Sequence, residues 1–359
     1  MIWIWVGFVL FILLLLALDL GVFHRKSHVV SLRESILWSG VWVLVALLFS
    51  TFIFNAYEGH WLGLGGDPDP VDGIVNDGRT ATLKYLTGYV VEKSLSVDNL
   101  FVIAMLFTFF AVPPIYQHRV LFWGVVGALV MRGAMIALGA KLIAEFHWLL
   151  YVFGGFLLLT GIKMLLIKDD ATDPSEAWAV RIARRLLPVS DRFHGSHFLV
   201  RAGSTAAAEA ATPGAAVEVD AALARAKPGT WLLTPLALAL ILVETTDLIF
   251  AVDSIPAIFA ITADPFLVFT SNVFAILGLR SLFFALAGLL DKFRYLKPSL
   301  AIVLILVGVK MLAADWLKRV LGGNFHFVLL GVIFGILATG VIASIVADAR
   351  QRARENGTR

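Results

Sequence analysis

Two short stretches of the sequence place acidic side chains inside long apolar runs. In each stretch, an acid is followed six residues later by a second acid and then by a small polar residue. The members are Glu92, Asp98 and Asn99 in the first stretch, and Asp247, Asp253 and Ser254 in the second. A carboxylate at membrane depth is costly unless it is protonated, paired or bound to a cation. Two matching stretches in one chain therefore predict a functional site.

These side chains offer only oxygen atoms as ligands. Carboxylate, amide and hydroxyl oxygens suit Mn²⁺, Mg²⁺ or Ca²⁺ better than copper or zinc. Glu244 and Asp19 also lie in apolar runs and could add further carboxylates. The chain has no cysteine, which excludes disulfides, thiolate chemistry and soft thiolate ligands. We predict a hard-cation site without a resident cofactor.

A second interpretation is that the acids only neutralise basic residues in the apolar runs. The candidate bases are Lys93, Arg132, Lys163, Arg280 and Lys310. Both interpretations stay open for Glu92 and Asp19, whereas the repetition of the motif favours function for Asp98 and Asp253. The two arginines could pair with motif acids when the site is empty, or could anchor helix ends. The lysines Lys163 and Lys310 lie near the ends of their apolar runs, so we expect them to snorkel toward water.

Helical geometry divides the motif residues into two groups. Glu92, Ser96 and Asn99 share one face of an ideal helix. Asp98 lies about 120° from that face, and Asp253 has the corresponding position in the second stretch. These two acids therefore face a neighbouring helix, or else the backbone near them is unwound. In the second stretch, Pro256 favours a break late in the helix.

The composition predicts an all-α polytopic membrane protein. Of the 359 residues, 59% are hydrophobic and only 15% are charged, which is too apolar for a soluble domain of this size. We predict nine spans, at 2–23, 35–57, 81–112, 120–143, 148–167, 231–260, 266–290, 299–313 and 325–347. The net charge of +3 is small, so nucleic acid is not a predicted partner. The predicted partners are the lipid bilayer, a divalent cation and protons.

The polar segments set the predicted organisation of the chain. We expect a two-helix hairpin at 1–57, three-helix units at 81–168 and 231–313, a polar loop at 169–228 and a ninth helix at 325–347. The Lys and Arg residues in the loops and the tail place the N-terminus outside and the C-terminus inside. Part of the polar loop has helical spacing and several arginines, which is typical of a surface helix at an anionic leaflet. Its Ala-rich part is predicted to be disordered, and a linker is favoured over a binding module.

An internal repeat connects the two acidic stretches. Asp98 is followed by Arg132 in the next span and then by a Gly-Ile-Lys-Met-Leu element that starts at Gly161. Asp253, Arg280 and an element starting at Gly308 occur in the same order, and the intervals from Arg to Gly are 29 and 28 residues. Because each copy has three helices, an odd number, the second copy enters the membrane from the side opposite to the first. This predicts the inverted repeat of secondary transporters, whose site lies near the midplane.

Three motifs resemble one known family. Residues 18–26, 92–102 and 244–256 are similar to the TerC family of bacterial membrane proteins, nearest its Alx-like branch. The similarity extends from the first span to the ninth, and the Ala-rich loop is a departure from the family pattern. The resemblance implies an inner-membrane protein of the lysine-exporter type, linked to manganese export and tellurite resistance. It also implies that Asp98 and Asp253 belong to the transport site.

We therefore predict a transporter, not an enzyme, that exports Mn²⁺ by alternating access in exchange for protons. The site would use Asp98, Asn99, Asp253 and Ser254, with Glu92, Asp247, Glu244 and Asp19 as further ligands or proton carriers. The tellurite link does not follow from the residues, because the chain has no thiol. The main alternative is a membrane partner that delivers metal to secreted proteins together with protein-translocation machinery. An intramembrane aspartyl protease is disfavoured because no Gly-x-Gly-Asp signature lies within a span.

Overall fold

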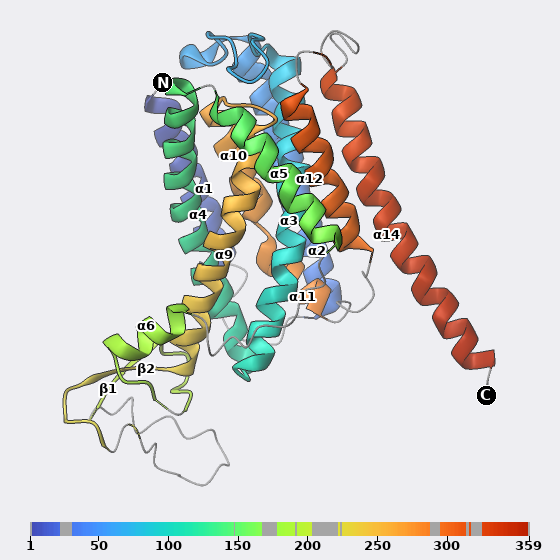
Figure 1. Ribbon diagram of the computed structural model, residues 1–359. Helices are drawn as coiled ribbons and strands as arrows, with labels where there is room; N and C mark the ends of the chain where they lie inside the picture. Colours follow the sequence, from blue (N-terminus) through green and yellow to red (C-terminus); the bar gives the residue numbers. More distant parts are fainter. Residues whose placement is uncertain are drawn as a thin grey trace.

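The computed structural model describes residues 2–21, 31–146, 148–166, 178–190, 192–202, 222, 225–287, 295–313, 316 and 325–357. The fold is an all-α bundle, as predicted (Figure 1). A small unit at one end, which we call the polar unit, contains residues 178–186, 199–201 and 231–233. The helices of the bundle are α1 (Ile2–Gly21), α2 (Leu32–Glu58), α3 (Gly78–Phe109), α4 (Pro114–Glu145), α5 (Leu149–Leu166), α9 (Pro235–Phe259), α10 (Pro265–Ile276), α11 (Leu279–Ala287), α12 (Leu296–Leu312) and α14 (Phe325–Gly357). The other elements are the 3₁₀ helix η1 (Trp61–Gly63), α6 (Trp178–Leu186), β1 (Leu199–Arg201) and β2 (Trp231–Leu233).

Each predicted span coincides with a helix or with the pair α10–α11. Among the described residues, six helical stretches are long and apolar enough to cross a membrane: 32–58, 114–143, 149–166, 235–259, 265–285 and 328–348. Shorter apolar helices occupy 2–18 and 298–312. Helix α3 has 32 residues and is about 48 Å long at 1.5 Å per residue. It is therefore longer than a bilayer core of about 30 Å and continues into a polar region at one end.

Capping residues set the start of several helices. Asp77 accepts a hydrogen bond from the backbone N–H of Thr80 at 2.7 Å and thereby begins α3. The same hydrogen bond stabilises the charged carboxylate and lowers the pKa of Asp77. Thr234 caps α9, and Asp264 accepts from two backbone N–H groups at the start of α10. Ser, Thr and Asp are preferred at this position because their oxygens satisfy otherwise unpaired N–H groups.

Helices α5 and α12 pack antiparallel through matching glycines of the two repeats. A Cβ atom at Gly161 would lie 2.8 Å from the carbonyl oxygen of Ala301, and one at Gly308 would lie 2.8 Å from that of Gly154. Gly154 and Ala301 occupy corresponding positions in the two copies, because each lies seven residues before the matching glycine, Gly161 or Gly308. Each of these two glycines therefore contacts the equivalent residue of the other copy. The packing has the two-fold relation that an inverted repeat requires.

Helices α3 and α9, which carry the acidic stretches, also run in opposite directions. Asp69, in the loop before α3, accepts hydrogen bonds from Lys84 of α3 and from Thr262, just after the end of α9. The start of α3 thus lies beside the end of α9. We call this end of the bundle the N-terminal face, because the N-terminus and the α2–α3 loop both lie there (Figure 1). The polar unit and the C-terminus lie at the opposite end.

The predicted break at Pro256 is wrong, because α9 is helical through this residue to Phe259. Pro256 lies in the last turn, where the missing N–H removes only one hydrogen bond and the chain ends its helix soon afterwards. Helix α3 is also continuous through Asp98. The backbone is broken instead between α10 and α11, where Gly278 has φ +78°. A Cβ atom at Gly278 would lie 2.6 Å from that of Trp42, so the turn also requires the small residue.

The sixth span begins later than predicted. Trp231–Leu233 forms β2, which pairs antiparallel with β1, and α9 starts only at Pro235. Helix α6 confirms the helical spacing expected around residues 176–187, and its buried residues Val180 and Ala183 belong to apolar clusters that also contain residues of α9. The Ala-rich segment lies outside the described residues.

Substituting Gly308 by Ala should destabilise the bundle. The new Cβ would lie 2.8 Å and 2.9 Å from backbone atoms of Gly154 and Leu158, which cannot move aside as a side chain can, so we expect a cost of about 1–3 kcal/mol. The measurement is thermal unfolding of the purified protein in detergent. Gly155→Ala is the matched control, because nothing lies within 4 Å of its Cβ position. Equal melting temperatures for the two variants would contradict the antiparallel contact.

Candidate functional site

Arg132 of α4 joins the acidic stretches of the two repeats. Its guanidinium forms an ion pair with Glu92 of α3 and a second one with Asp247 of α9, where Nη2 and Oδ1 are 2.9 Å apart. It also donates a hydrogen bond to the Ser254 hydroxyl at 3.2 Å. The side chains of Arg132 and Glu92 are almost fully buried, and that of Asp247 is 14% exposed. We call these four residues the Arg132 cluster.

The predicted polar face of α3 is confirmed as a buried face. Glu92, Ser96 and Asn99 are all buried, as is Ser254 on α9. Within the described part of the chain, the Ser96 hydroxyl and the Oε2 atom of Glu92 are buried and have no hydrogen-bond partner. Buried polar atoms are normally paired, so these oxygens have unused capacity to accept a proton or a cation.

Glu244 lies one helical turn before Asp247, against α4. A side chain at Gly127 would overlap the Glu244 carboxylate, so the glycine provides the space that this acid occupies. Its Oε2 atom is also buried without a hydrogen-bond partner among the described residues. Glu244 therefore adds a second carboxylate to the α9 side of the site.

Three predicted site residues lie within helices of the bundle. Asp98 lies within α3, Asp253 within α9 and Asp19 within α1, but their side chains are outside the described residues. Among the residues that the structure does describe, no group of three or more His, Asp or Glu side chains is arranged to hold a metal ion. Their metal binding stays a prediction.

The basic residues of the apolar helices have different roles in the two repeats. Lys93 of α3 donates to the carbonyl oxygens of Ala275 and Leu277 at 3.1 Å and 3.3 Å. It thereby satisfies the end of α10 at the break, where carbonyl groups lack helical partners. Lys310 is buried and donates to the carbonyl of Ala260 just after α9, so the prediction that it snorkels is wrong. Lys163, its counterpart in the first repeat, is exposed.

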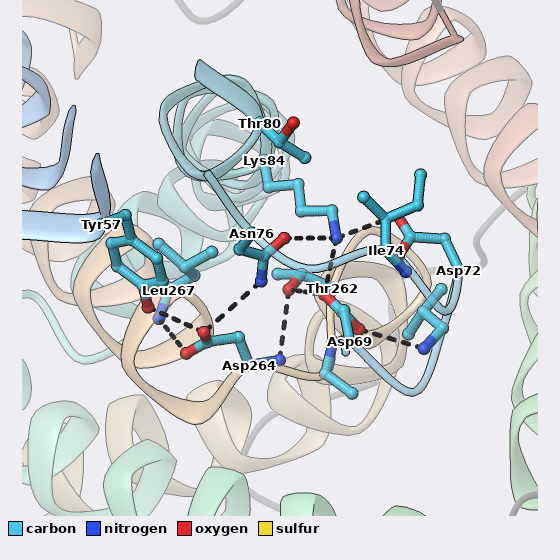
Figure 2. A network of polar contacts seen from close by, with 12 residues as sticks. Tyr57, Asp69, Asp72, Ile74, Asn76, Thr80, Lys84, Thr262, Asp264 and Leu267 are labelled. Atoms are coloured by element: carbon cyan, nitrogen blue, oxygen red, sulfur yellow. Dashed lines mark hydrogen bonds and ion pairs between the residues drawn. The ribbon is translucent and has the colours of Figure 1, made fainter. Parts of the chain in front are cut away.

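A second buried polar network lies at the N-terminal face (Figure 2). The Lys84 ammonium is within 2.8 Å of Asp69 Oδ2, 2.9 Å of Asp72 Oδ2 and 2.8 Å of Asn76 Oδ1. Lys84 and Asp69 have fully buried side chains. Thr262 joins this network because its hydroxyl donates a hydrogen bond to Asp69. We call the five residues the Lys84 network: Lys84, Asp69, Asp72, Asn76 and Thr262.

Asp264 extends this network toward α2. It accepts hydrogen bonds from the hydroxyl of Tyr57 at 2.8 Å and from the Asn76 amide at 3.5 Å. Burial disfavours the charged carboxylate and raises the pKa of Asp264 above its ordinary value. Sequence reasoning missed the whole network. The only local signal was Lys84 itself, a charge placed eight residues before Glu92 in the same apolar run.

Comparisons with known proteins agree with this architecture. A family model described as "Integral membrane protein TerC family" matches residues 77–352. The chain is 45% identical to an "Uncharacterized membrane protein STKORF319" of Myxococcus xanthus, over 96% of this chain and 92% of that protein. It is 40% identical to the Escherichia coli K12 protein named "Putative membrane-bound redox modulator Alx", over 99% of this chain and 98% of that one. No solved structure matches the chain.

Substituting Arg132 by Gln should destabilise the protein strongly. Glu92 would remain buried with an uncompensated charge, which typically costs about 3–5 kcal/mol. Adding Glu92→Gln should restore part of this loss, because it removes the unpaired charge. Thermal unfolding of both single variants and the double variant measures the coupling, with Arg181→Gln on an exposed position of α6 as the control. If the two substitutions changed the stability of the protein additively, the ion pair between Arg132 and Glu92 would make no contribution of its own.

Proposed function

Because the chain belongs to the TerC family of integral membrane proteins, we propose that it is a transporter that exports a divalent cation, namely Mn²⁺. The transport path would run through the Arg132 cluster at the interface of the two repeats. The family and the multi-pass architecture support a membrane role, and the cation and its direction are our inference. The protein would lie in the bacterial inner membrane, with the N-terminal face outside.

The observation that carries this proposal is the charge balance of the Arg132 cluster. Glu92 and Asp247 together supply two negative charges from opposite repeats, and Arg132 supplies one positive charge between them. A divalent cation that took the place of the guanidinium would neutralise both carboxylates. Arg132 then acts as a tethered counter-cation, which keeps the buried acids paired while no ion is bound.

The ligands near Arg132 favour a hard cation. The cluster presents carboxylate and hydroxyl oxygens, including the unpaired Oε2 of Glu92 and the hydroxyl of Ser96. Mn²⁺ and Mg²⁺ are bound by such oxygens, whereas copper and structural zinc commonly use sulfur or imidazole. Manganese is chosen over magnesium on the family resemblance alone. Asp98 and Asp253 would complete the ligand set from the two copies of the motif.

Proton exchange would use the same carboxylates. Glu244 and Glu92 each have a buried oxygen without a hydrogen-bond partner in the described part of the chain, and such an oxygen is able to accept a proton. If these acids are protonated after the cation leaves, the proton replaces the charge of the ion. One cation would thus be exchanged for protons as the two repeats alternate their access to the two sides.

The names of the relatives raise a second candidate function. Several relatives are named as redox modulators. This chain has no cysteine, so a redox role would not use its own thiols. Control of a redox-active cation such as manganese would connect such a role with transport. Delivery of metal to secreted proteins through a partner is the alternative that does not require flux by the protein alone.

Flux in vesicles tests the transport proposal. The purified protein is reconstituted into lipid vesicles, and Mn²⁺ movement is followed with an enclosed metal-sensitive dye. We expect Asp247→Asn and Asp98→Asn each to lower the flux at least about tenfold, which corresponds to the loss of about 1.4 kcal/mol of interaction with the ion. Glu145→Gln, at an exposed position at the end of α4, should leave it unchanged. Unaltered flux in both aspartate variants would refute the assignment of the site.

A cellular measurement separates export from delivery. Cells that lack the protein are challenged with Mn²⁺ and complemented with the wild type or with Asp98→Asn, and their total metal content is determined. Export predicts that manganese accumulates and that only the wild type relieves it. If manganese stays constant while secreted metalloenzymes lose their metal, delivery to partners is the better description.

A further inference from the structure

One carboxylate joins the two repeats at the N-terminal face. Oδ2 of Asp69 accepts hydrogen bonds from Lys84, in the first repeat, and from the hydroxyl of Thr262, in the second. Its other oxygen, Oδ1, accepts from the backbone N–H of Ala263 at 3.0 Å. Asp69 itself belongs to the α2–α3 loop (Figure 2). Asp69 thus fastens the loop to both repeats, and Asn76 of the same loop adds a second link through Lys84 and Asp264.

Along α3, this fastening lies between the Arg132 cluster and the N-terminal face. Lys84 precedes Glu92 by eight residues on α3, which corresponds to about 12 Å along the helix axis. Between them, Gly88 packs closely on α10, where a Cβ atom would lie 2.9 Å from the Ser271 hydroxyl. An ion that left the cluster toward the N-terminal face would therefore meet the Lys84 network first.

The α2–α3 loop is built in a way that allows it to move as a unit. His60 and Leu62, close to the end of α2, have φ values of +46° and +54°, which L side chains rarely adopt. Such residues persist only where the surrounding contacts hold them, so the backbone would relax if the loop swung outward. Gly65 and Gly73 have φ values of +66° and +63°, and most of the loop between them is exposed or only partly buried.

A pocket already reaches the fastening from the N-terminal face. It is lined by the loop, by Trp5 of α1, by Ala140 of α4 and by the turn between α9 and α10. Its lining includes Asp69, Asn76 and Asp264. Release of the loop would extend this pocket inward between α3 and α9, which are the two helices that carry the acidic stretches.

We propose that the α2–α3 loop is a latch that closes the N-terminal end of the transport path, with the Lys84–Asp69–Thr262 contacts as its fastening. The role of the latch in transport rests on the proposed function, because alternating access requires the two repeats to separate at one face at a time. The described conformation is the one that is closed at this face. Opening separates Asp69 from Thr262 and Ala263, separates Asn76 from Asp264, and leaves α5 and α12 in contact.

The natural absence of cysteine provides a direct test. Ala263→Cys introduces a single thiol beneath the loop, at a position that is 5% exposed. Its rate of reaction with a membrane-impermeant maleimide reports how often the loop opens. Thr262→Val keeps the shape of the side chain but removes the hydrogen bond to Asp69. Since hydrogen bonds to charged groups are among the stronger ones, we expect about tenfold faster labelling.

Lys84→Gln should accelerate labelling further, because it removes the charge that holds Asp69 and Asp72. This variant leaves two buried acids without their cation and could lose its fold, so Thr262→Val is the decisive variant. Val75→Cys is the control, since this residue of the same loop is 45% exposed and should label at the same rate in every background. Melting temperatures establish that each variant is folded.

The latch is refuted if folded Thr262→Val and Lys84→Gln proteins label at the wild-type rate. Labelling needs no cation flux, so its result does not depend on the transport proposal. Mn²⁺ flux of the same variants in vesicles gives the second readout. If the labelling rate is unchanged while Mn²⁺ flux is normal, the result contradicts the latch but not the transport proposal. Faster labelling beside absent wild-type flux supports a mobile loop and counts against transport.

Discussion

The burial of charge in an apolar bundle is the constraint on which the arrangement of the helices depends. Arg132 remains charged at any physiological pH, so it must keep an acid within reach wherever it is buried. Glu92 and Asp247 meet this requirement from two helices that are far apart in sequence. Their approach in turn requires small residues on α4. Gly127 leaves the space that Glu244 fills, and a Cβ atom at Gly124 would lie 3.1 Å from Val243. The glycines thus bring α9 close enough for one guanidinium to bridge both repeats.

The two repeats share a plan but differ in their second helix and in the burial of their matching lysines. The glycine contacts of α5 and α12 are nearly symmetric, which gives a firm antiparallel pair. Around this pair, α4 is continuous, whereas its counterpart is divided into α10 and α11. Lys163 is exposed, and Lys310 is buried against the end of α9. An inverted repeat whose halves were identical would treat both faces alike, so these differences make the two faces of the bundle unequal.

Local signals in the sequence predicted the helices and the buried face of α3, because helix length, caps and spacing depend on near neighbours. The Ser96 and Asn99 positions follow from helical periodicity alone. The break in the bundle could not be located in this way, since Pro256 is a strong local signal but lies in a last turn that tolerates it. The break lies at Gly278, which has a positive φ and lies close to Trp42, a residue of a distant helix. The Lys84 network was invisible for the same reason, because its central contact joins residues separated by 193 positions.

Two buried cations, Lys84 of α3 and Arg132 of α4, pair with carboxylates that link them to the second repeat: Asp69, which also contacts Thr262, and Asp247. Arg132 keeps its charge at any physiological pH, because a guanidinium is not deprotonated in proteins. A competing cation that bound its acids would therefore change its pairing. Asp69 and Asp247 are the acids that reach across to contact both repeats. In the proposed transport cycle, ion binding at these carboxylates would therefore also change the contacts between the two repeats.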